Sequence, residues 1–199
     1  MTEVVDEAEV AIVGGGILGC SIAYHLCRRG IADVVLVERA ELATQATARA
    51  AGLVLHGASD RNAVRMVRRT RAAMAELEDE FGEDPGFRPV GSLALVQAQE
   101  RMADVLAAAA LLRDEGVPVE QLTPQAARAL CPWLEPADAA LITFTPDDGY
   151  VDGARLAMSY LRAARRLGAR MRRGVGVEGF TRAGDRVTGV VTSAGEIRA

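Results

Sequence analysis

Apolar and polar positions along the first forty residues predict a strand, a helix and a second strand. Residues 10–13 and 34–37 are short apolar runs rich in valine. Between them, residues 20–29 carry the mixed apolar and polar spacing of a helix, which ends at Gly30. This order predicts a βαβ unit, in which two parallel strands are joined through a helix.

Longer periodic segments after residue 57 predict four more helices. They span residues 60–81, 99–115, 124–131 and 154–167. Three of these segments are preceded by a residue whose side chain can cap a helix, namely Ser59, Thr123 and Asp152. Pro124 occupies the first helical position of its segment, where a missing N–H costs nothing.

Shorter segments of strand-like residues lie between and after these helices. They span residues 87–96, 139–145, 175–177, 186–192 and 196–198. Because strands return after the helix at residues 154–167, they can rejoin the first sheet. We therefore predict an α/β fold, in which a Rossmann-like domain with a mostly parallel sheet is interrupted by an α+β substrate domain. The expected parts are residues 1–83, 84–146 and 147–199, the first and third forming one domain.

The link between the first strand and its helix is a G-x-G-x-x-G turn. It consists of Gly14, Gly16 and Gly19, and Glu38 follows nineteen residues after the last of them. The first glycine permits a tight turn, the second lets a pyrophosphate approach the backbone, and the third lets the helix pack closely. Free N–H groups and the positive end of the helix dipole attract the diphosphate, and Glu38 can accept hydrogen bonds from a ribose diol. An ordinary glycine turn needs neither the second strand nor the acid, so the pattern favours dinucleotide binding.

The charged residues exclude lysine-based catalysis and argue against one class of partner. All 23 basic residues are arginines, since the chain has no lysine, and this excludes a lysine Schiff base or a lysine general base. With 27 acidic residues the net charge is −4, which argues against a nucleic-acid partner. Arginines cluster at residues 61–71 and 162–173, where the spacing is typical of the solvated faces of amphipathic helices.

The cysteines and the apolar segments indicate a cytoplasmic protein without a metal site or a membrane span. Cys20, Cys27 and Cys131 show neither C-x-x-C spacing nor a zinc pattern, and they fit a reducing compartment. The first ten residues carry four acids and no base, unlike a signal peptide. The apolar stretch at residues 10–26 contains three consecutive glycines and is better explained as a strand followed by a helix.

Four further segments carry a more specific pattern. They read TARAAGL at residues 47–53, PVGSL at residues 89–93, PDDGYVD at residues 146–152 and GVVT at residues 189–192. With the opening VAIVGGGILGCSIAYHL, they resemble the FAD-dependent amine oxidoreductases of the D-amino-acid oxidase superfamily. This group includes glycine oxidase, sarcosine oxidase, and the sarcosine and dimethylglycine dehydrogenases. The similarity spans essentially the whole chain in family order.

The resemblance implies FAD as the cofactor and an FAD-binding domain whose substrate domain is incomplete. In this family a further strand, the rest of the substrate domain and a glycine-rich flavin-contacting segment follow the position of Ala199. We therefore expect an N-terminal part of such an enzyme, or a split subunit completed by a second polypeptide. By itself the chain is expected to turn over no sarcosine, dimethylglycine or D-amino acid.

The resemblance also implies a set of cofactor-binding residues. These are Gly14, Gly15, Gly16, Ile17, Gly19, Glu38, Arg39, Thr47, Arg49, Ala51, Gly52, Leu53 and Val177. Arg49 stands where one branch of the family has a histidine that can carry flavin covalently, so the resemblance implies non-covalent FAD. The alternative for Arg49 is a surface arginine, and the alternative for Val177 is a core side chain.

The implied reaction is oxidation of the C–N bond of an amino acid or N-methylated amine, such as sarcosine, dimethylglycine or glycine, by hydride transfer to flavin N5. Two alternatives stay open: a non-catalytic or split-subunit FAD-binding fragment, and a NAD(P)-binding Rossmann enzyme. No catalytic residue is assigned, because no Ser/His/Asp constellation is evident. His25 is interpreted as structural, whereas His56 is a candidate for the active-site side.

Overall fold

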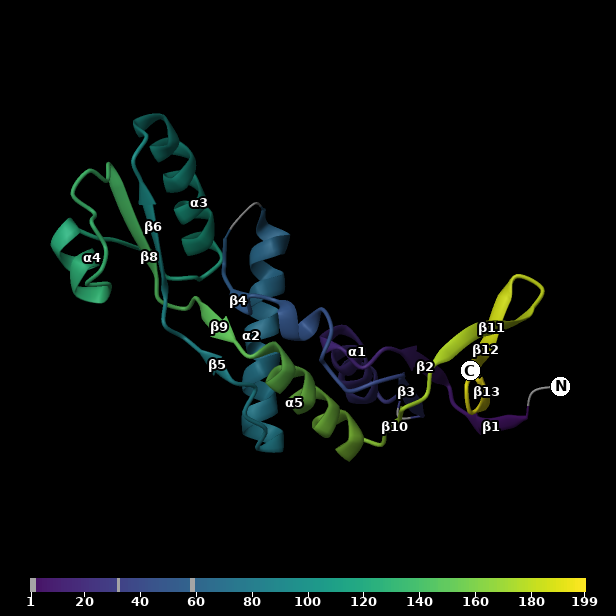
Figure 1. Ribbon diagram of the computed structural model, residues 1–199. Coiled ribbons are helices and arrows are strands. Elements are labelled where there is room, and N and C mark those ends of the chain that lie inside the picture. Colours follow the sequence, from purple (N-terminus) through teal and green to yellow (C-terminus); the bar gives the residue numbers. More distant parts are fainter. Residues whose placement is uncertain (1–2, 32, 58–59) are drawn as a thin grey trace. The chain divides into compact units, whose positions relative to one another are not determined.

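The computed structural model describes residues 3–31, 33–57 and 60–199, and it forms two compact units (Figure 1). The first unit comprises Met1–Ala51, Glu76–Gly86 and Asp152–Ala199, and the second comprises Gly52–Ala75 and Phe87–Val151. The proposed helix cap Ser59 lies outside the described residues. The domain boundaries expected from the sequence stay a prediction.

A parallel three-stranded sheet forms the centre of the first unit, as predicted. Its strand order is β10-β3-β2, and both pairings are parallel. The central strand is almost fully buried from Val34 to Val37, which is why it reads as an unbroken apolar run. Helix α1 packs against α5 in this unit. The elements are β2 (Val10–Val13), α1 (Ile17–Arg28), β3 (Val34–Glu38), α5 (Gly153–Arg166) and β10 (Arg170–Arg173).

A second sheet of the first unit has the order β1-β13-β12-β11. Val190 and Ile197 from this sheet join Val35 and Val37 of β3 in one buried cluster. The predicted hairpin is confirmed, but the strand predicted at residues 175–177 is wrong except for Val177, where β11 begins. The strands are β1 (Val4–Glu7), β11 (Val177–Ala183), β12 (Arg186–Thr192) and β13 (Gly195–Arg198).

Two of the strands in the first unit have no apolar run and were not predicted. The strand β10 reads RMRR, and it forms because it pairs with the buried β3. Its Arg170 bonds to Asp6 and Asp33, and its Arg172 bonds to Asp6 at 2.7 Å. The strand β1 gains its pairing from β13, at the far end of the sequence.

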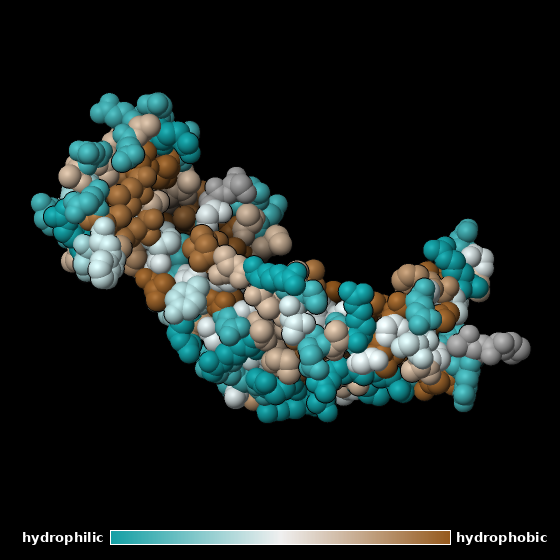
Figure 2. All heavy atoms as spheres, viewed as in Figure 1, coloured by the Kyte–Doolittle hydropathy of each residue, from teal (hydrophilic) through white to brown (hydrophobic). Residues whose placement is uncertain are grey.

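The second unit contains two small sheets, with the orders β4-β9-β5 and β6-β8-β7, and all their pairings are antiparallel. Hydrophobic residues gather over β6 and β8 in this unit (Figure 2). The strands are β4 (Leu53–Val54), β5 (Phe87–Arg88), β6 (Ser92–Val96), β7 (Glu120–Gln121), β8 (Leu141–Thr145) and β9 (Gly149–Val151). The helices are α2 (Arg61–Phe81), of which residues 76–81 belong to the first unit, α3 (Met102–Asp114) and α4 (Pro124–Leu130). Short 3₁₀ turns lie at Thr47–Arg49 and Gln99–Arg101.

The helix starts follow the predicted capping residues. The Thr123 hydroxyl accepts a hydrogen bond from the Ala126 N–H at 3.2 Å. The Asp152 carboxylate accepts bonds from the first turn of α5 at 2.9 and 3.0 Å. Both caps satisfy N–H groups that have no partner within their own helix. In the described part of the chain, no helix has the length and apolarity needed to cross a membrane.

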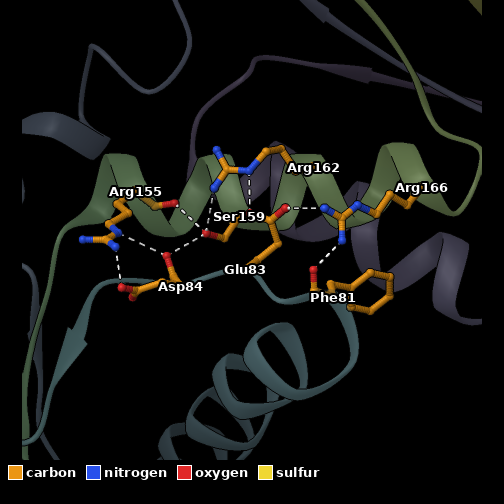
Figure 3. Close-up of polar contacts among 7 residues, drawn as sticks. All are labelled: Phe81, Glu83, Asp84, Arg155, Ser159, Arg162 and Arg166. Atoms are coloured by element: carbon orange, nitrogen blue, oxygen red, sulfur yellow. Dashed lines mark hydrogen bonds and ion pairs between the residues drawn. The ribbon is translucent and has the colours of Figure 1, made fainter.

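A buried carboxylate ties helix α5 to the loop that follows α2 in the first unit. Glu83 is only 6% exposed, and it accepts hydrogen bonds from Arg162 at 2.5 Å and from Arg166 at 3.2 Å (Figure 3). Next to it, Arg155 bonds to the carboxylate of Asp84. A buried carboxylate needs such partners to offset its loss of hydration.

Another buried carboxylate connects α2 and α3 in the second unit. Glu115 follows the last turn of α3, and it bonds to Arg61 at 2.7 Å and to Arg65 at 2.8 Å. The hydrogen bonds from Arg65 and Arg61 hold the pKa of Glu115 at about 2, against the effect of burial. Arg68 donates to the main-chain oxygen of Glu115, so three arginines surround the carboxyl end of α3.

We expect Glu83→Gln to lower the free energy of unfolding by about 1–2 kcal/mol, because the charge that two arginines share is lost. The matched control is Glu80→Gln, which removes an exposed ion pair with Arg28. Its effect should stay within about 0.5 kcal/mol. Urea titration measures the free energy of unfolding of both variants. Equal losses in the two variants would contradict the role given to Glu83.

The depressed pKa of Glu115 predicts an acid sensitivity with a definite sign. Because this pKa is lowered from 4.5 to about 2 in the folded chain, its stabilising effect is full above pH 4.5 and is lost as the pH falls toward 2. Glu115→Gln should therefore lose stability at pH 7 and show a flatter dependence of stability on pH below 4.5. Thermal unfolding between pH 7 and pH 2.5 measures this difference, and parallel curves for the two proteins would refute it.

Candidate functional site

The glycine turn between β2 and α1 is closed most tightly at Gly19, which has no room for a side chain. A Cβ atom on Gly19 would lie 1.9 Å from the carbonyl oxygen of Gly14. Gly14 itself has a φ angle of +105°, which disfavours any other residue, and its N–H bonds to Val37 O at 2.8 Å. The start of α1 therefore lies directly against the ends of β2 and β3.

Glu38 ends β3 and braces this turn. One carboxylate oxygen accepts a hydrogen bond from the Gly15 N–H at 2.7 Å, and the other accepts one from the Ala40 N–H at 2.8 Å. The sequence predicted only the role toward a ribose, so the bracing role is a finding of the structure. Each carboxylate oxygen has a second lone pair, which leaves capacity for two hydroxyl donors.

The loop after Glu38 passes over the start of α1. The Ala43 N–H donates to Gly15 O at 3.0 Å, and the buried Thr47 hydroxyl accepts from the Ile17 N–H at 3.0 Å. Thr47 therefore satisfies one free donor of the first helical turn from 30 residues away. No side chain caps α1 at Gly16, and its first turn carries no acidic residue.

These elements enclose a pocket of about 430 Å³ in the first unit. The turn provides one wall, the loop provides the other, and Glu38 lies at the end of β3. The lining residues are Val13, Gly14, Gly16, Ile17, Leu18, Gly19, Glu38, Glu41, Ala43, Thr44, Gln45, Ala46, Thr47 and Ala50.

The electrostatics of the pocket fit a diphosphate joined to a sugar. The positive end of the α1 dipole faces the pocket and the first turn of α1 contains no acid, while Glu38 and Glu41 line the pocket and Glu38 supplies acceptors for hydroxyl groups. Behind the turn, burial and then the charge of Glu38 raise the pKa of Cys20 to about 11. The Cys20 thiol is thus neutral and adds no negative charge near the turn.

The structure brings some of the other predicted residues to this region. The backbone of Val175 bonds to Glu38 O at 3.0 Å, and this places residues 175–177 beside the end of β3. Gly176 lies next to Arg39, with 3.7 Å between a Cβ built on the glycine and the Cβ of the arginine. The side chain of Val177 packs against the buried cluster around Val35 and Val37.

The remaining predicted residues do not line the pocket. Arg49 and Ala51 are exposed in the first unit. Gly52 and Leu53 belong to the second unit, where Leu53 pairs with Tyr150 in the β4-β9 ladder. A Cβ atom on Gly52 would lie 2.2 Å from Val151 O, so this glycine is required by that close approach.

A polar cluster that the sequence did not reveal lies in the second unit. His56 and Asp148 are each 3% exposed, and the imidazole Nδ1 lies 2.7 Å from a carboxylate oxygen of Asp148. The Ser92 hydroxyl donates to the other oxygen at 2.5 Å. No Ser/His/Asp constellation is evident in the sequence, and here the aspartate bonds to both of the other residues. The three residues are 36 to 92 positions apart, so no local pattern could have shown it.

Comparisons with known proteins find relatives along almost the whole chain. The mouse pyruvate dehydrogenase phosphatase regulatory subunit is 31% identical over 96% of this chain. The 4-methylaminobutanoate oxidase of Paenarthrobacter nicotinovorans is 32% identical over 92% of the chain, and rat dimethylglycine dehydrogenase is 31% identical over 98%. The chain spans 22%, 22% and 23% of the lengths of these three relatives.

A solved structure shows the same fold. The crystal structure of L-proline dehydrogenase from P. horikoshii matches 97% of this chain with a TM-score of 0.88 and 25% sequence identity. The match covers 51% of that protein. A family model described as FAD dependent oxidoreductase matches residues 9–199. The chain belongs to the D-amino-acid oxidase family of FAD-dependent oxidoreductases.

Proposed function

We propose that this chain binds FAD non-covalently and serves a reaction that oxidises the C–N bond of an amino acid or N-methylated amine. The observation that carries the proposal is the pocket between the glycine turn and the loop at residues 41–50, with Glu38 at its end. The curated relatives support the substrate class, since two of them are named for methylated amines.

Within this proposal the predicted residues divide by the part of FAD that each group would hold. The start of α1 would hold the diphosphate, and Glu38 would accept hydrogen bonds from the adenosine ribose. Arg39 and Val177 would border the adenine, and Thr47, Arg49 and Ala51 of the first unit would lie nearer the flavin. Gly52 and Leu53 stay predicted cofactor residues of the second unit. The residues assigned to the diphosphate are Gly14, Gly15, Gly16, Ile17 and Gly19.

When bound, the flavin would supply the acceptor for the hydride, which carries two electrons away from the substrate carbon. The residues of this chain orient the cofactor and exclude water from its diphosphate. Glu38 holds both the turn and the ribose, so one carboxylate fixes the position of the cofactor against α1.

A second candidate is a subunit that binds FAD without catalysis. The observation that favours it is the 31% identity to a relative named as a regulatory subunit. For the enzyme the proposed partner is a small amine or amino acid. For either candidate a second polypeptide is a further proposed partner. We also propose a cytoplasmic location, because the three scattered cysteines fit a reducing compartment.

We expect Glu38→Gln to weaken FAD binding by about ten- to a hundred-fold, because the bonds to the ribose hydroxyls lose a charged acceptor. Quenching of flavin fluorescence measures the affinity. The matched control is Glu178→Gln, an exposed glutamate on β11 of the same unit, which should leave the affinity unchanged. Equal affinities in all three proteins would defeat the site assignment. Tighter binding of NAD than of FAD would instead support a NAD(P)-binding enzyme.

We expect the FAD-loaded chain alone to leave sarcosine and dimethylglycine unoxidised, because no group that would clamp the substrate carboxylate has been assigned in it. Anaerobic titration followed by flavin absorbance measures this. Bleaching of the bound flavin by either amine would show that these 199 residues suffice for the reaction. That result would also exclude the non-catalytic candidate.

A further inference from the structure

A second pocket lies in the second unit, between the β6-β8 sheet and helix α3. It has a volume of about 180 Å³, which is enough for a molecule of a few heavy atoms. One wall is apolar and comes from α3, with Val105, Ala108 and Leu112. The opposite wall is polar and comes from the strands and from the loops that follow β4 and β8.

Two threonine hydroxyls on this polar wall lack a partner in the protein. Thr143 and Thr145 lie on the same face of the central strand β8, and they are only 6% and 8% exposed. Neither hydroxyl has a hydrogen bond within the described part of the chain. No sealed side-chain polar atom in the described residues lacks a partner, so these two hydroxyl oxygens keep some accessible surface, and both residues line the pocket. Buried hydroxyl groups that face a cavity need hydrogen-bonding partners inside it.

The polar wall also carries a negative charge. The carboxylate of Asp148 accepts hydrogen bonds from the His56 N–H at 2.8 Å, from its Nδ1 at 2.7 Å and from Ser92 at 2.5 Å. Asp148 is the one acidic residue among those that line the pocket. No arginine lines the pocket, and the chain has no lysine.

This combination selects for a small organic cation. An ammonium group can donate to the oxygens of Thr143 and Thr145 and is attracted by Asp148. Methyl groups on the same ion would contact Val105, Ala108 and Leu112 on the helix wall. An anion of the same size would meet the carboxylate without a compensating cation.

We propose that this pocket is a binding site for a small alkylammonium ion, distinct from the cofactor pocket of the first unit. The site stands on its own geometry and does not depend on FAD binding. The juxtaposition that defines it is a pair of unpartnered threonine hydroxyls, a buried aspartate and an apolar helix face around one cavity.

Methylammonium chloride tests the proposal with the full chain. Titration at pH 8, followed by threonine methyl NMR signals, should show saturable shifts at Thr143 and Thr145. Potassium chloride and sodium acetate at equal ionic strength should give no saturable shift. Calorimetry of the same titration gives the affinity.

The double variant Thr143→Val/Thr145→Val removes both hydroxyls and keeps the side-chain shape. It should bind methylammonium at least about ten-fold more weakly, as expected when two hydrogen bonds are lost. The control Thr70→Val changes an exposed hydroxyl that bonds to Met66 O on α2, and its affinity should be unchanged. Ala108→Leu fills the pocket from the helix side and should abolish binding even if the double variant is unstable. Absence of saturation, equal binding of acetate, or unchanged affinity in Ala108→Leu would overturn the proposal.

Discussion

The close approach of Gly19 to the carbonyl of Gly14 is the constraint on which the cofactor site depends. With 1.9 Å between that oxygen and a Cβ on Gly19, only a glycine lets α1 begin against the end of β2. This contact aims the first turn of the helix at the pocket. Glu38 then fixes the turn through the Gly15 N–H, and the same carboxylate faces the space where a ribose would lie. The residues that pack the glycine turn therefore also line the pocket.

Buried carboxylates surrounded by arginines organise both units in the same physical way. Glu83 anchors α5 in the first unit, and Glu115 anchors α2 to the end of α3 in the second. In each case the arginines are partly exposed while the acid is buried, so the arginine chains shield the acid from water. Because a carboxylate can accept several hydrogen bonds, one acid can join two arginine side chains of a helix. A chain without lysine makes repeated use of this arrangement.

Sequence patterns were sufficient to predict those elements whose structure depends on residues close together in the sequence. The βαβ unit, the glycine turn and the caps at Thr123 and Asp152 all follow from local spacing. The strand β10 could not be predicted, because its RMRR sequence becomes a strand only through pairing with β3. The sequence also did not reveal the bracing role of Glu38, whose partner Gly15 lies 23 positions away. It did not reveal the contact of His56 with Asp148 either, because the fold brings these residues together over 92 positions.

The loop over the glycine turn contains a residue in an unfavourable backbone conformation, and this conformation helps to hold the loop against the turn. Ala43 has a φ angle of +58°, and this left-handed conformation costs an alanine about 1 kcal/mol. The same conformation lets its N–H reach Gly15 O and places its side chain among buried atoms. Thr47 then reaches Ile17, so the loop is fixed at two points on the turn. Contacts within the chain thus hold the second wall of the pocket in place, and this reduces the ordering of residues 41–50 that cofactor binding requires.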